Sequence, residues 1–250
     1  MKKLCSLLKH IDIIEFQNEK DIDIRGIAYH SGKVEDGFLF VAIKGYKTDG
    51  HKYIAEAIKN GAVALVVEDI QPDINVPQIQ VEDSRKALAF LSDAFYNHPT
   101  QDIKVIGITA TNGKTSTSFM TYTILEKAGF KTGIIGTIMT KFGNYIEPSI
   151  LTTPESLDLQ RFFSQMREQK ISHAVMEVSS SALELHRVAN VDFDIVTLNN
   201  IGREHIDLHG SFEQYVNVKT SLIRNAKESA WAVLNLDCPY SRSLIDETRA

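Results

Sequence analysis

The sequence predicts an α/β fold, in which a small N-terminal α/β domain precedes a P-loop-type, doubly wound, mostly parallel sheet. Two observations carry this prediction. Apolar runs of strand length alternate with stretches of helical periodicity, as is typical of parallel sheets with helices on both faces. One such strand, 103–108, leads into Gly113, Lys114 and Thr115 and then into a helix, the order expected of a phosphate-binding loop.

Composition sets the class of protein. The chain has 250 residues, 43% of them hydrophobic and 24% charged, which suffices for two domains with their own cores. A net charge of -5 gives no general attraction to nucleic acid or to anionic membranes. Cys5 and Cys238 imply no disulfide framework, and no apolar run approaches the roughly 18 residues of a membrane helix. We therefore expect a cytoplasmic protein without membrane insertion or nucleic-acid partner.

The N-terminal domain is predicted to cover residues 1–99. Its apolar patterns alternate between periods of 3.6 and 2 residues, and Gly61 and Pro99 are natural terminators of the helices that precede them. Asp83 or Ser84 can cap the last of these helices. The expected order is helix 3–11, strand 22–28, strand 38–43, helix 51–60, strand 62–67 and a helix from 83 or 84 to 97.

The second domain is predicted to cover residues 100–250, because the polar segment 97–101 is the best boundary in the chain. Here strands and helices alternate regularly. We expect strands 103–108, 133–139, 173–178, 193–199 and 232–237, and helices 114–128, 156–169, one that begins after Ser211, and 240–249.

The segment after strand 103–108 predicts an ATP site. Backbone N–H groups at a helix N-terminus can bind phosphate, Lys114 can reach the outer phosphates, and the Thr115 hydroxyl can hold Mg2+. The strict pattern G-x-x-x-x-G-K-[ST] requires glycine at position 108, whereas this chain has Ile108 and offers Gly107 instead. The loop is thus a variant, and the alternative is an ordinary turn between strand and helix.

Polar side chains also follow the other predicted strands, where ligands of such sheets bind. Glu177 ends one apolar strand, and a carboxylate there is costly to bury unless it is paired or binds metal. It is either a Mg2+ ligand or a hydrogen-bonded structural carboxylate. A further strand leads to His205, Asp207 and His209, but zinc is not expected there because no further ligands with zinc-like spacing follow.

The helix after Ser211 carries an unusual lysine. Ser211 and Gln214 form a capping-box pattern, and Lys219 lies on the same face as the apolar residues of this helix, Phe212, Tyr215, Val216, Leu222 and Ile223. Lys219 could extend its charged end to solvent along this face. Alternatively, it faces an active site as a reactive amine.

A polar loop at 44–51 contains two glycines, two lysines and a histidine. Composition alone leaves open whether it is a solvated loop or binds a ligand.

Together, these segments resemble the Mur ligase family, ATP-dependent amide ligases that include the folylpolyglutamate synthetases. The resemblance is strongest to the branch that extends UDP-MurNAc-dipeptide to a tripeptide, and it covers essentially the whole chain. The matching segments are F-V-A-I-K-G-Y-K-T-D-G-H at 40–51, D-S-R-K-A-L-A-F-L-S-D-A-F-Y-N-H-P at 83–99, T-A-T-N-G-K-T at 109–115, T-T-P-E-S at 152–156, M-E-V-S-S at 176–180 and H-x-D-x-H-G-[ST]-x-E-x-Y-x-x-x-K at 205–219.

The resemblance implies roles for individual residues. It implies catalytic roles for Lys114, Lys219, Glu177 and His205, and Mg2+ ligation by Thr115, Glu177, His205 and a CO2-derived carbamate on Lys219. The residues implied in ATP binding are Thr109, Thr111, Asn112, Gly113, Lys114, Thr115 and Ser116. Those implied in binding the UDP-substrate are Ser31, Lys47, Thr48, Asp49, Gly50, His51, Thr152, Thr153, Ser179 and Arg187.

The resemblance also implies a reaction. ATP would phosphorylate the D-glutamate carboxylate of UDP-MurNAc-L-Ala-D-Glu, and an amino acid would displace phosphate from the acyl phosphate to form an amide. Residues 1–99 would bind the UDP-substrate and 100–250 would bind ATP. The family's C-terminal ligase domain is absent from these residues, so we expect the chain alone to bind ligands without forming product. We also expect a monomer.

Three positions depart from the family pattern. His30-Ser31-Gly32 replaces D-S-R, Ser181 replaces a histidine, and Ala110 replaces a loop glycine, where a positive φ would strain alanine. Two alternatives therefore stay open. One is another ligase of the superfamily, acting on folylpolyglutamate or poly-amino-acid substrates, and the other is a nucleotide-binding relative without turnover.

Overall fold

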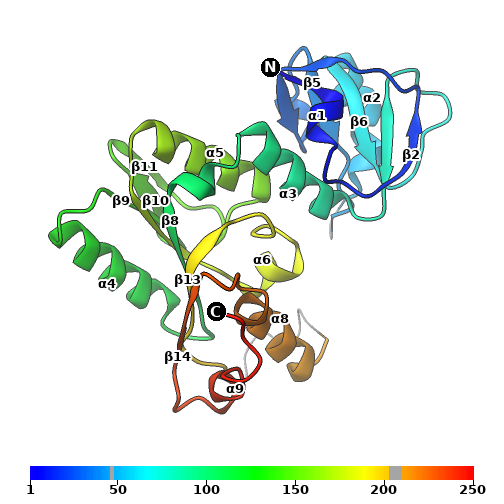
Figure 1. The fold of residues 1–250 in the computed structure, drawn as a ribbon. Coiled ribbons are helices and arrows are strands. Elements are labelled where there is room, and N and C mark those ends of the chain that lie inside the picture. The colour runs from blue at the N-terminus through cyan, green and yellow to red at the C-terminus, as the bar shows by residue number, and fades with distance from the viewer. Residues whose placement is uncertain (46–47, 203–209) are drawn as a thin grey trace. The chain divides into compact units, whose positions relative to one another are not determined.

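A computed structural model describes residues 1–45, 48–202 and 210–250. The chain forms two compact units, Met1–Asn97 and His98–Ala250, which divide within the polar segment 97–101 (Figure 1). Within the described residues, no helix is both long and apolar enough to cross a membrane. The prediction of a small α/β domain followed by a mostly parallel sheet is confirmed.

The first unit contains a five-stranded sheet in the order β2-β7-β6-β5-β4. Strands β4 to β7 run parallel to their neighbours, and β2 is antiparallel to β7. A separate antiparallel pair joins β1 to β3. The strands are β1 (Lys2–Lys3), β2 (Ile13–Gln17), β3 (Asp23–Ile24), β4 (Gly26–Ala28), β5 (Phe38–Val41), β6 (Ala62–Val67) and β7 (Gln78–Val81).

The helices of this unit are α1 (Leu4–Leu7), α2 (Ile54–Lys59) and α3 (Ser84–Phe95), with short 3-10 turns η1 (Ser31–Lys33) and η2 (Gly50–Tyr53). Asp83 caps α3 as expected, because its side chain accepts hydrogen bonds from the N–H groups of Arg85 and Lys86. A core of mostly aliphatic side chains, among them Ile54 and Leu65, together with the Phe40 ring, packs α2 onto the sheet.

Several predicted elements of the first unit are wrong in extent. The helix expected at 3–11 is limited to Leu4–Leu7, because Lys2–Lys3 pairs with β3 and the chain extends again at Ile13 to pair with β7. The single strand expected at 22–28 is broken at Arg25, whose N–H donates to the carbonyl of Gly37, so that its two halves join different sheets. Strands β2 and β7 were not predicted.

The second unit is built on a seven-stranded sheet in the order β11-β10-β9-β12-β8-β13-β14. The five strands from β9 to β14 in this order are parallel, whereas β10 and β11 form an antiparallel hairpin at one edge. The strands are β8 (Lys104–Thr109), β9 (Thr132–Ile135), β10 (Met139–Phe142), β11 (Tyr145–Pro148), β12 (His173–Glu177), β13 (Phe193–Leu198) and β14 (Trp231–Leu234).

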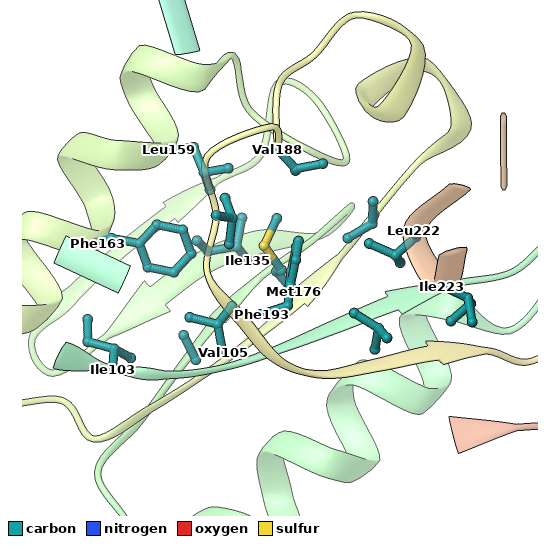
Figure 2. Packing of buried hydrophobic residues seen from close by; sticks show 14 of the residues in the cluster. Ile103, Val105, Ile135, Leu159, Phe163, Met176, Val188, Phe193, Leu222 and Ile223 are labelled. Atoms are coloured by element: carbon teal, nitrogen blue, oxygen red, sulfur yellow. The ribbon is translucent and has the colours of Figure 1, made fainter. Parts of the chain in front are cut away.

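Alternate residues of the central strands face two different cores. Ile106 and Ile108 of β8 pack against α4 (Lys114–Lys127), whereas Val105 belongs to the larger core on the opposite face. Figure 2 shows this larger core, where Phe163, Leu222 and other helical side chains meet the strands. Its helices are α5 (Ser156–Glu168), α6 (Ser180–Glu184), α8 (Phe212–Arg224) and the short α9 (Pro239–Arg242), and a 3-10 turn, η3 (Pro99–Asp102), precedes β8.

Three features of the second unit correct the sequence prediction. The strand expected at 133–139 ends at Ile135, and the chain then forms the hairpin β10–β11, which was not predicted. The helix expected at 240–249 is limited to Pro239–Arg242. Gly107 lies inside β8 rather than in the phosphate loop, and it leaves room for the Phe193 ring, which lies 2.6 Å from the position a Cβ would take.

Asp194 joins the first residues of β13 to β8. Its carboxylate accepts hydrogen bonds of 2.9 Å from Lys104 Nζ and from the N–H of Val105, and Lys227 Nζ lies 3.6 Å away. Burial opposes ionisation of this group, but the hydrogen bonds and the two lysines hold its pKa below its ordinary value. The ionised form is therefore stabilised by folding.

Asp194→Asn is expected to lower the free energy of unfolding by about 1–3 kcal/mol at neutral pH, because hydrogen bonds to a charged group are lost. Since folding lowers the pKa of Asp194, its contribution is present above the unfolded pKa near 4 and is lost as pH falls through the lower folded value. Urea unfolding at pH 7 and pH 3 should show the difference between variant and wild type shrinking at pH 3. The exposed Asp246→Asn is the control, and an undiminished difference at pH 3 would contradict the assignment.

Candidate functional site

The carboxyl ends of four parallel strands bring the candidate site residues together. The strand β8 leads to the loop 110–113, β9 to Gly136 and Thr137, β12 ends at Glu177, and β13 leads to Asn199 and Asn200. Because β12, β8 and β13 are neighbours in the sheet, these segments lie at one edge. This is where parallel α/β sheets bind their ligands.

The loop between β8 and α4 has the backbone of a phosphate-binding loop. Gly113 adopts φ +86°, which favours glycine, and it immediately precedes Lys114, the first residue of α4. Asn112 and Ser116 are exposed, and Lys114 and Thr115 are partly exposed at this helix N-terminus. A 14-residue helix places positive partial charge and N–H groups there.

The side chains of two of the threonines expected to bind ATP are buried within the second unit. Thr111 is buried; its hydroxyl accepts from the N–H of Gly202 at 2.8 Å and lies 2.8 Å from the Tyr215 hydroxyl. Thr109 is also fully buried, within β8. Asn200 binds the loop from β13, because its side chain accepts from the N–H of Asn112 at 3.0 Å and donates to the Asn112 carbonyl at 2.9 Å.

Ala110 is not strained. Among the described non-glycine residues, positive φ occurs only at Asn18, Asn97, His98, Lys170 and His186. The expectation that position 110 requires a glycine conformation is therefore wrong. Ala110 is fully buried, and its carbonyl oxygen accepts hydrogen bonds from two lysines, Lys114 Nζ at 2.9 Å and Lys219 Nζ at 2.7 Å.

Lys219 lies where the helical pattern placed it. The Ser211 hydroxyl caps α8 by accepting from the N–H of Gln214, and Lys219 is only 2% exposed on the inward face. Its ammonium does not extend to solvent; it reaches the Ala110 carbonyl and lies 5.1 Å from the centre of the Tyr215 ring. The prediction that Lys219 faces the interior of the second unit is therefore confirmed, and its Nζ lies beside the loop 110–113.

Glu177 is fully buried at the end of β12. Its Oε2 accepts from the hydroxyls of Thr115 at 2.9 Å and Thr137 at 3.1 Å, and its Oε1 accepts from the N–H of Thr137 at 2.9 Å. Within the described residues, Glu177 takes part in no ion pair. A buried carboxylate with neutral partners next to the Thr115 hydroxyl fits the oxygen ligands that Mg2+ prefers.

Gly136 makes room for this carboxylate. A Cβ at Gly136 would lie 2.3 Å from Glu177 Oε1 and 2.9 Å from Glu177 Cδ, closer than non-bonded atoms approach. Because Gly136 has no side chain, the Glu177 carboxylate can occupy this space.

The segment 152–155 is tied to the end of β12. The fully buried Thr153 donates to the Glu177 carbonyl at 2.8 Å and accepts from the N–H of Ser179 at 3.1 Å. Arg187 donates to the Thr153 carbonyl at 3.1 Å and forms a 2.9 Å ion pair with Glu155. Thr153 and Arg187 therefore hold the segment 152–155 in place. The neighbouring Thr152 is partly exposed, and its hydroxyl oxygen lies 3.1 Å from the hydroxyl oxygen of Thr137. Ser181, which replaces the family's histidine, lies 3.1 Å from the Ser179 hydroxyl.

In the first unit, the predicted substrate residues also make internal contacts. Asp49 accepts from the N–H of His51 at 3.0 Å and lies 2.7 Å from His51 Nδ1, while His51 Nε2 accepts from the N–H of Glu68. Burial opposes ionisation of Asp49, but its hydrogen bonds to His51 lower the pKa of its carboxyl.

Ser31, Thr48 and Gly50, which were also predicted to bind the substrate, likewise make contacts within the first unit. Ser31 is buried and donates to Glu56 at 2.9 Å, and the Thr48 hydroxyl lies 3.3 Å from the Tyr53 hydroxyl. Gly50 allows a close backbone approach, because a Cβ there would lie 2.7 Å from the Ile43 nitrogen. Residues 48–51 therefore have a defined structure held by contacts within the first unit, and a role of this loop in ligand binding stays a prediction.

Some predicted site residues lie outside the described part of the chain. These are Lys47 and the residues of the expected metal segment, His205, Asp207 and His209. The roles predicted for Lys47 and His205, and the exclusion of zinc at 205–209, stay predictions.

Comparison with protein families identifies the chain. Residues 23–96 match the model of the Mur ligase family catalytic domain, and residues 108–250, more than half of the chain, match the Mur ligase middle domain. The chain belongs to the Mur ligase family. Curated relatives include UDP-N-acetylmuramoyl-L-alanyl-D-glutamate--2,6-diaminopimelate ligases from Caldanaerobacter subterraneus subsp. tengcongensis, 45% identical over 99% of this chain, and from Clostridium perfringens, 42% identical over 98%. The chain covers 51% and 50% of these two relatives, and so spans about half the length of the curated relatives it matches.

Solved Mur ligase structures share the fold. A structure of a UDP-N-acetylmuramoyl-L-alanyl-D-glutamate--2,6-diaminopimelate ligase matches 90% of this chain and 45% of that one, with a TM-score of 0.77 and 27% identity. The MurF ligase of Thermotoga maritima in complex with ADP matches 92% of this chain and 50% of that one, with a TM-score of 0.62 and 27% identity.

Sequence reasoning missed four residues of this candidate site. Gly136 and Thr137 follow the observed end of β9 at Ile135, and Asn199 and Asn200 follow the observed end of β13 at Leu198. The predicted strands 133–139 and 193–199 ran too far and included the first three of these residues, so only Asn200 followed a predicted strand. Asn199 donates to the Thr117 hydroxyl at 2.8 Å and so joins β13 to α4. The rule that ligands bind beyond the carboxyl ends of parallel strands would have singled out Gly136, Thr137 and Asn199 only if the strands had been predicted to end at 135 and 198.

Gly136→Ala is expected to displace the Glu177 side chain and to lower the free energy of unfolding by about 1–3 kcal/mol, because overpacking forces a buried group from its position. The matched control is Gly202→Ala, also at this site, where a Cβ would lie 3.6 Å from Thr111 Cγ2, an ordinary contact. Thermal and urea unfolding of both variants would measure the difference. Equal stability of the two variants would show that Glu177 is not held against Gly136.

Proposed function

We propose that this chain is the substrate- and ATP-binding part of an ATP-dependent amide ligase that adds the third amino acid to UDP-MurNAc-L-Ala-D-Glu in peptidoglycan precursor synthesis. The observation that carries the proposal is the buried carboxylate of Glu177 beside Thr115, at the N-terminus of α4, in a chain whose curated relatives have this ligase name. The incoming amino acid of those relatives is 2,6-diaminopimelate.

The chemistry requires activation of a carboxylate. A carboxylate is a poor acyl donor to an amine until one of its oxygens becomes part of a phosphate leaving group. The protein's contribution to such a reaction is positioning and charge neutralisation. Lys114 has the length and charge to leave the carbonyls of Ala110 and Thr111, to which it donates at 2.9 and 3.1 Å, and to bind phosphate oxygens instead.

The nucleotide would bind at the loop 112–116, through backbone N–H groups at the start of α4. Thr109 and Thr111 would act indirectly by holding the loop in shape. Thr115 and Glu177 would hold Mg2+, together with His205, which follows from the resemblance alone. When bound, the ion would neutralise charge on the phosphates.

Lys219 is the remaining proposed group. Its hydrogen bonds to Thr109 and Ala110 end on neutral oxygens, at 3.5 and 2.7 Å. A buried amine can react with CO2 in its neutral form. We propose that Lys219 carries a carbamate, which would replace a cation by an anion beside the site of Mg2+.

The UDP-substrate is proposed to contact Thr152 and Ser179 in the second unit and the loop 47–51 in the first. Thr153 and Arg187 are assigned to holding the 152–155 segment rather than to direct contact, because their polar groups bind the protein itself. The protein is further proposed to act as a monomer in the cytoplasm.

Calorimetric titration of the chain with three ligands separates this function from its rivals. The ligands are a non-hydrolysable ATP analogue with Mg2+, UDP-MurNAc-L-Ala-D-Glu, and a folylpolyglutamate. Binding of the first two supports the proposal. Binding of the analogue and the folylpolyglutamate would favour the other ligase branch, and binding of the analogue alone would favour a nucleotide-binding relative without turnover.

Lys114→Ala is expected to weaken binding of the Mg2+–ATP analogue at least tenfold, about 1.4 kcal/mol, because a charge-assisted contact to phosphate is lost. Lys127→Ala, at the far end of the same helix, is the matched control and should bind as wild type. Thermal unfolding should be measured in parallel, since Lys114 also donates to the loop carbonyls. Unchanged affinity of folded Lys114→Ala would refute the assignment of this loop as the phosphate site.

A further inference from the structure

Thr137 is the residue of the site for which neither the motifs nor the relatives suggest a role. It follows β9 and is exposed, yet it holds both oxygens of the buried Glu177, through its N–H at 2.9 Å and its hydroxyl at 3.1 Å. The same hydroxyl oxygen lies 3.1 Å from the Thr152 hydroxyl. Thr137 thus joins the carboxylate proposed to bind metal to the segment proposed to bind the UDP-substrate.

The direction of these hydrogen bonds is fixed by chemistry. An ionised carboxylate only accepts, and a hydroxyl has one proton to donate. Since Thr137 donates its proton to Glu177, the hydrogen bond between the two threonines must be donated by Thr152. The order is therefore Thr152 to Thr137 to Glu177, and Thr152 presents only acceptor lone pairs to a ligand.

Metal binding would change this order. Once Glu177 shares its oxygens with a cation, it is a weaker acceptor for Thr137, and the Thr137 proton can turn toward Thr152. The proton of Thr152 then becomes available to an acceptor oxygen of a ligand. We propose that Thr137 is a positioning residue that couples metal–nucleotide binding at Glu177 to binding of the UDP-substrate at Thr152, by reversing the polarity of this chain of hydroxyls.

The inference rests on the proposed function, since it takes UDP-MurNAc-L-Ala-D-Glu as the ligand of Thr152. A sugar-peptide of this kind is rich in carbonyl and carboxylate oxygens, which accept hydrogen bonds. Gain of one donor at Thr152 corresponds to about three- to tenfold in affinity, the usual range for a net hydrogen bond. This lies at the lower end of the coupling that is typical between two sites.

The coupling factor is the test. The Kd of UDP-MurNAc-L-Ala-D-Glu is measured by calorimetry on this chain, with and without saturating Mg2+ and the non-hydrolysable ATP analogue. Wild type should bind about three- to tenfold more tightly with the Mg2+–nucleotide. The reverse titration should give the same factor, because coupling between two binding equilibria is reciprocal.

Three variants assign the coupling to the hydroxyl. Thr137→Val keeps the shape and the backbone N–H but lacks the hydroxyl, and its coupling factor should fall to about one. Thr137→Ser restores the hydroxyl and should restore the factor. Thr132→Val, which removes a buried hydroxyl from the other end of β9, should leave it unchanged. A merely structural role of Thr137 would alter stability or both affinities without removing the factor selectively.

The outcomes separate the inference from the function. If wild type binds both ligands without coupling, or Thr137→Val keeps the full factor, the inference is wrong and the proposed function stands. If wild type binds the nucleotide but not UDP-MurNAc-L-Ala-D-Glu, the proposed function fails, and the inference with it.

Discussion

The arrangement of residues around the carboxyl ends of the second unit's strands depends on one buried carboxylate, that of Glu177. Glu177 ends β12 with no exposed surface, and in the part of the chain that the structure describes its carboxylate accepts hydrogen bonds from Thr115 and Thr137 and forms no ion pair. A charge removed from water at such a place is costly unless every lone pair has a partner. The close approach at Gly136, the position of Thr137 and the hydroxyl of Thr115 can all be understood as meeting that requirement. Gly136 and Thr137 follow β9, whereas Thr115 lies in α4.

The loop 110–113, between β8 and α4, depends in turn on elements far from it in sequence. Asn200, at the end of β13, binds the backbone of Asn112, and Tyr215 of α8 lies beside the Thr111 hydroxyl. The loop is thus held from the strand on one side and from a helix about a hundred residues later on the other. Rigid support of this kind is what a site that works by positioning requires, because small displacements of reacting groups are costly.

The sequence predicted most of this fold where elements are long and regular. The helices α3, α4, α5 and α8 and the strands β6, β8, β12 and β13 all have clear periodicity or strong end signals. The prediction failed for α1, for α9 and for the hairpin β10–β11, which are all short segments of four residues per helix or strand and so leave little periodic pattern. At α1, pairing of Lys2 and Lys3 with the more distant β3 also limits the helix. For the site, motifs located Lys114, Glu177 and Lys219 correctly at one edge of the sheet. They could not show that Thr109, Thr111, Thr153 and Arg187 use their polar groups internally, because the direction of a side chain depends on tertiary packing.

The two lysine ammonium groups converge on the carbonyl oxygen of Ala110, and this acceptor belongs to the main chain. No exchange of side chain can remove it. Evolution at position 110 is therefore limited by size, since the residue is fully buried, but not by hydrogen-bonding chemistry. This accounts for how alanine can replace the family's glycine there while the backbone still receives both lysines, and it implies that sequence identity is a poor guide to the importance of this position.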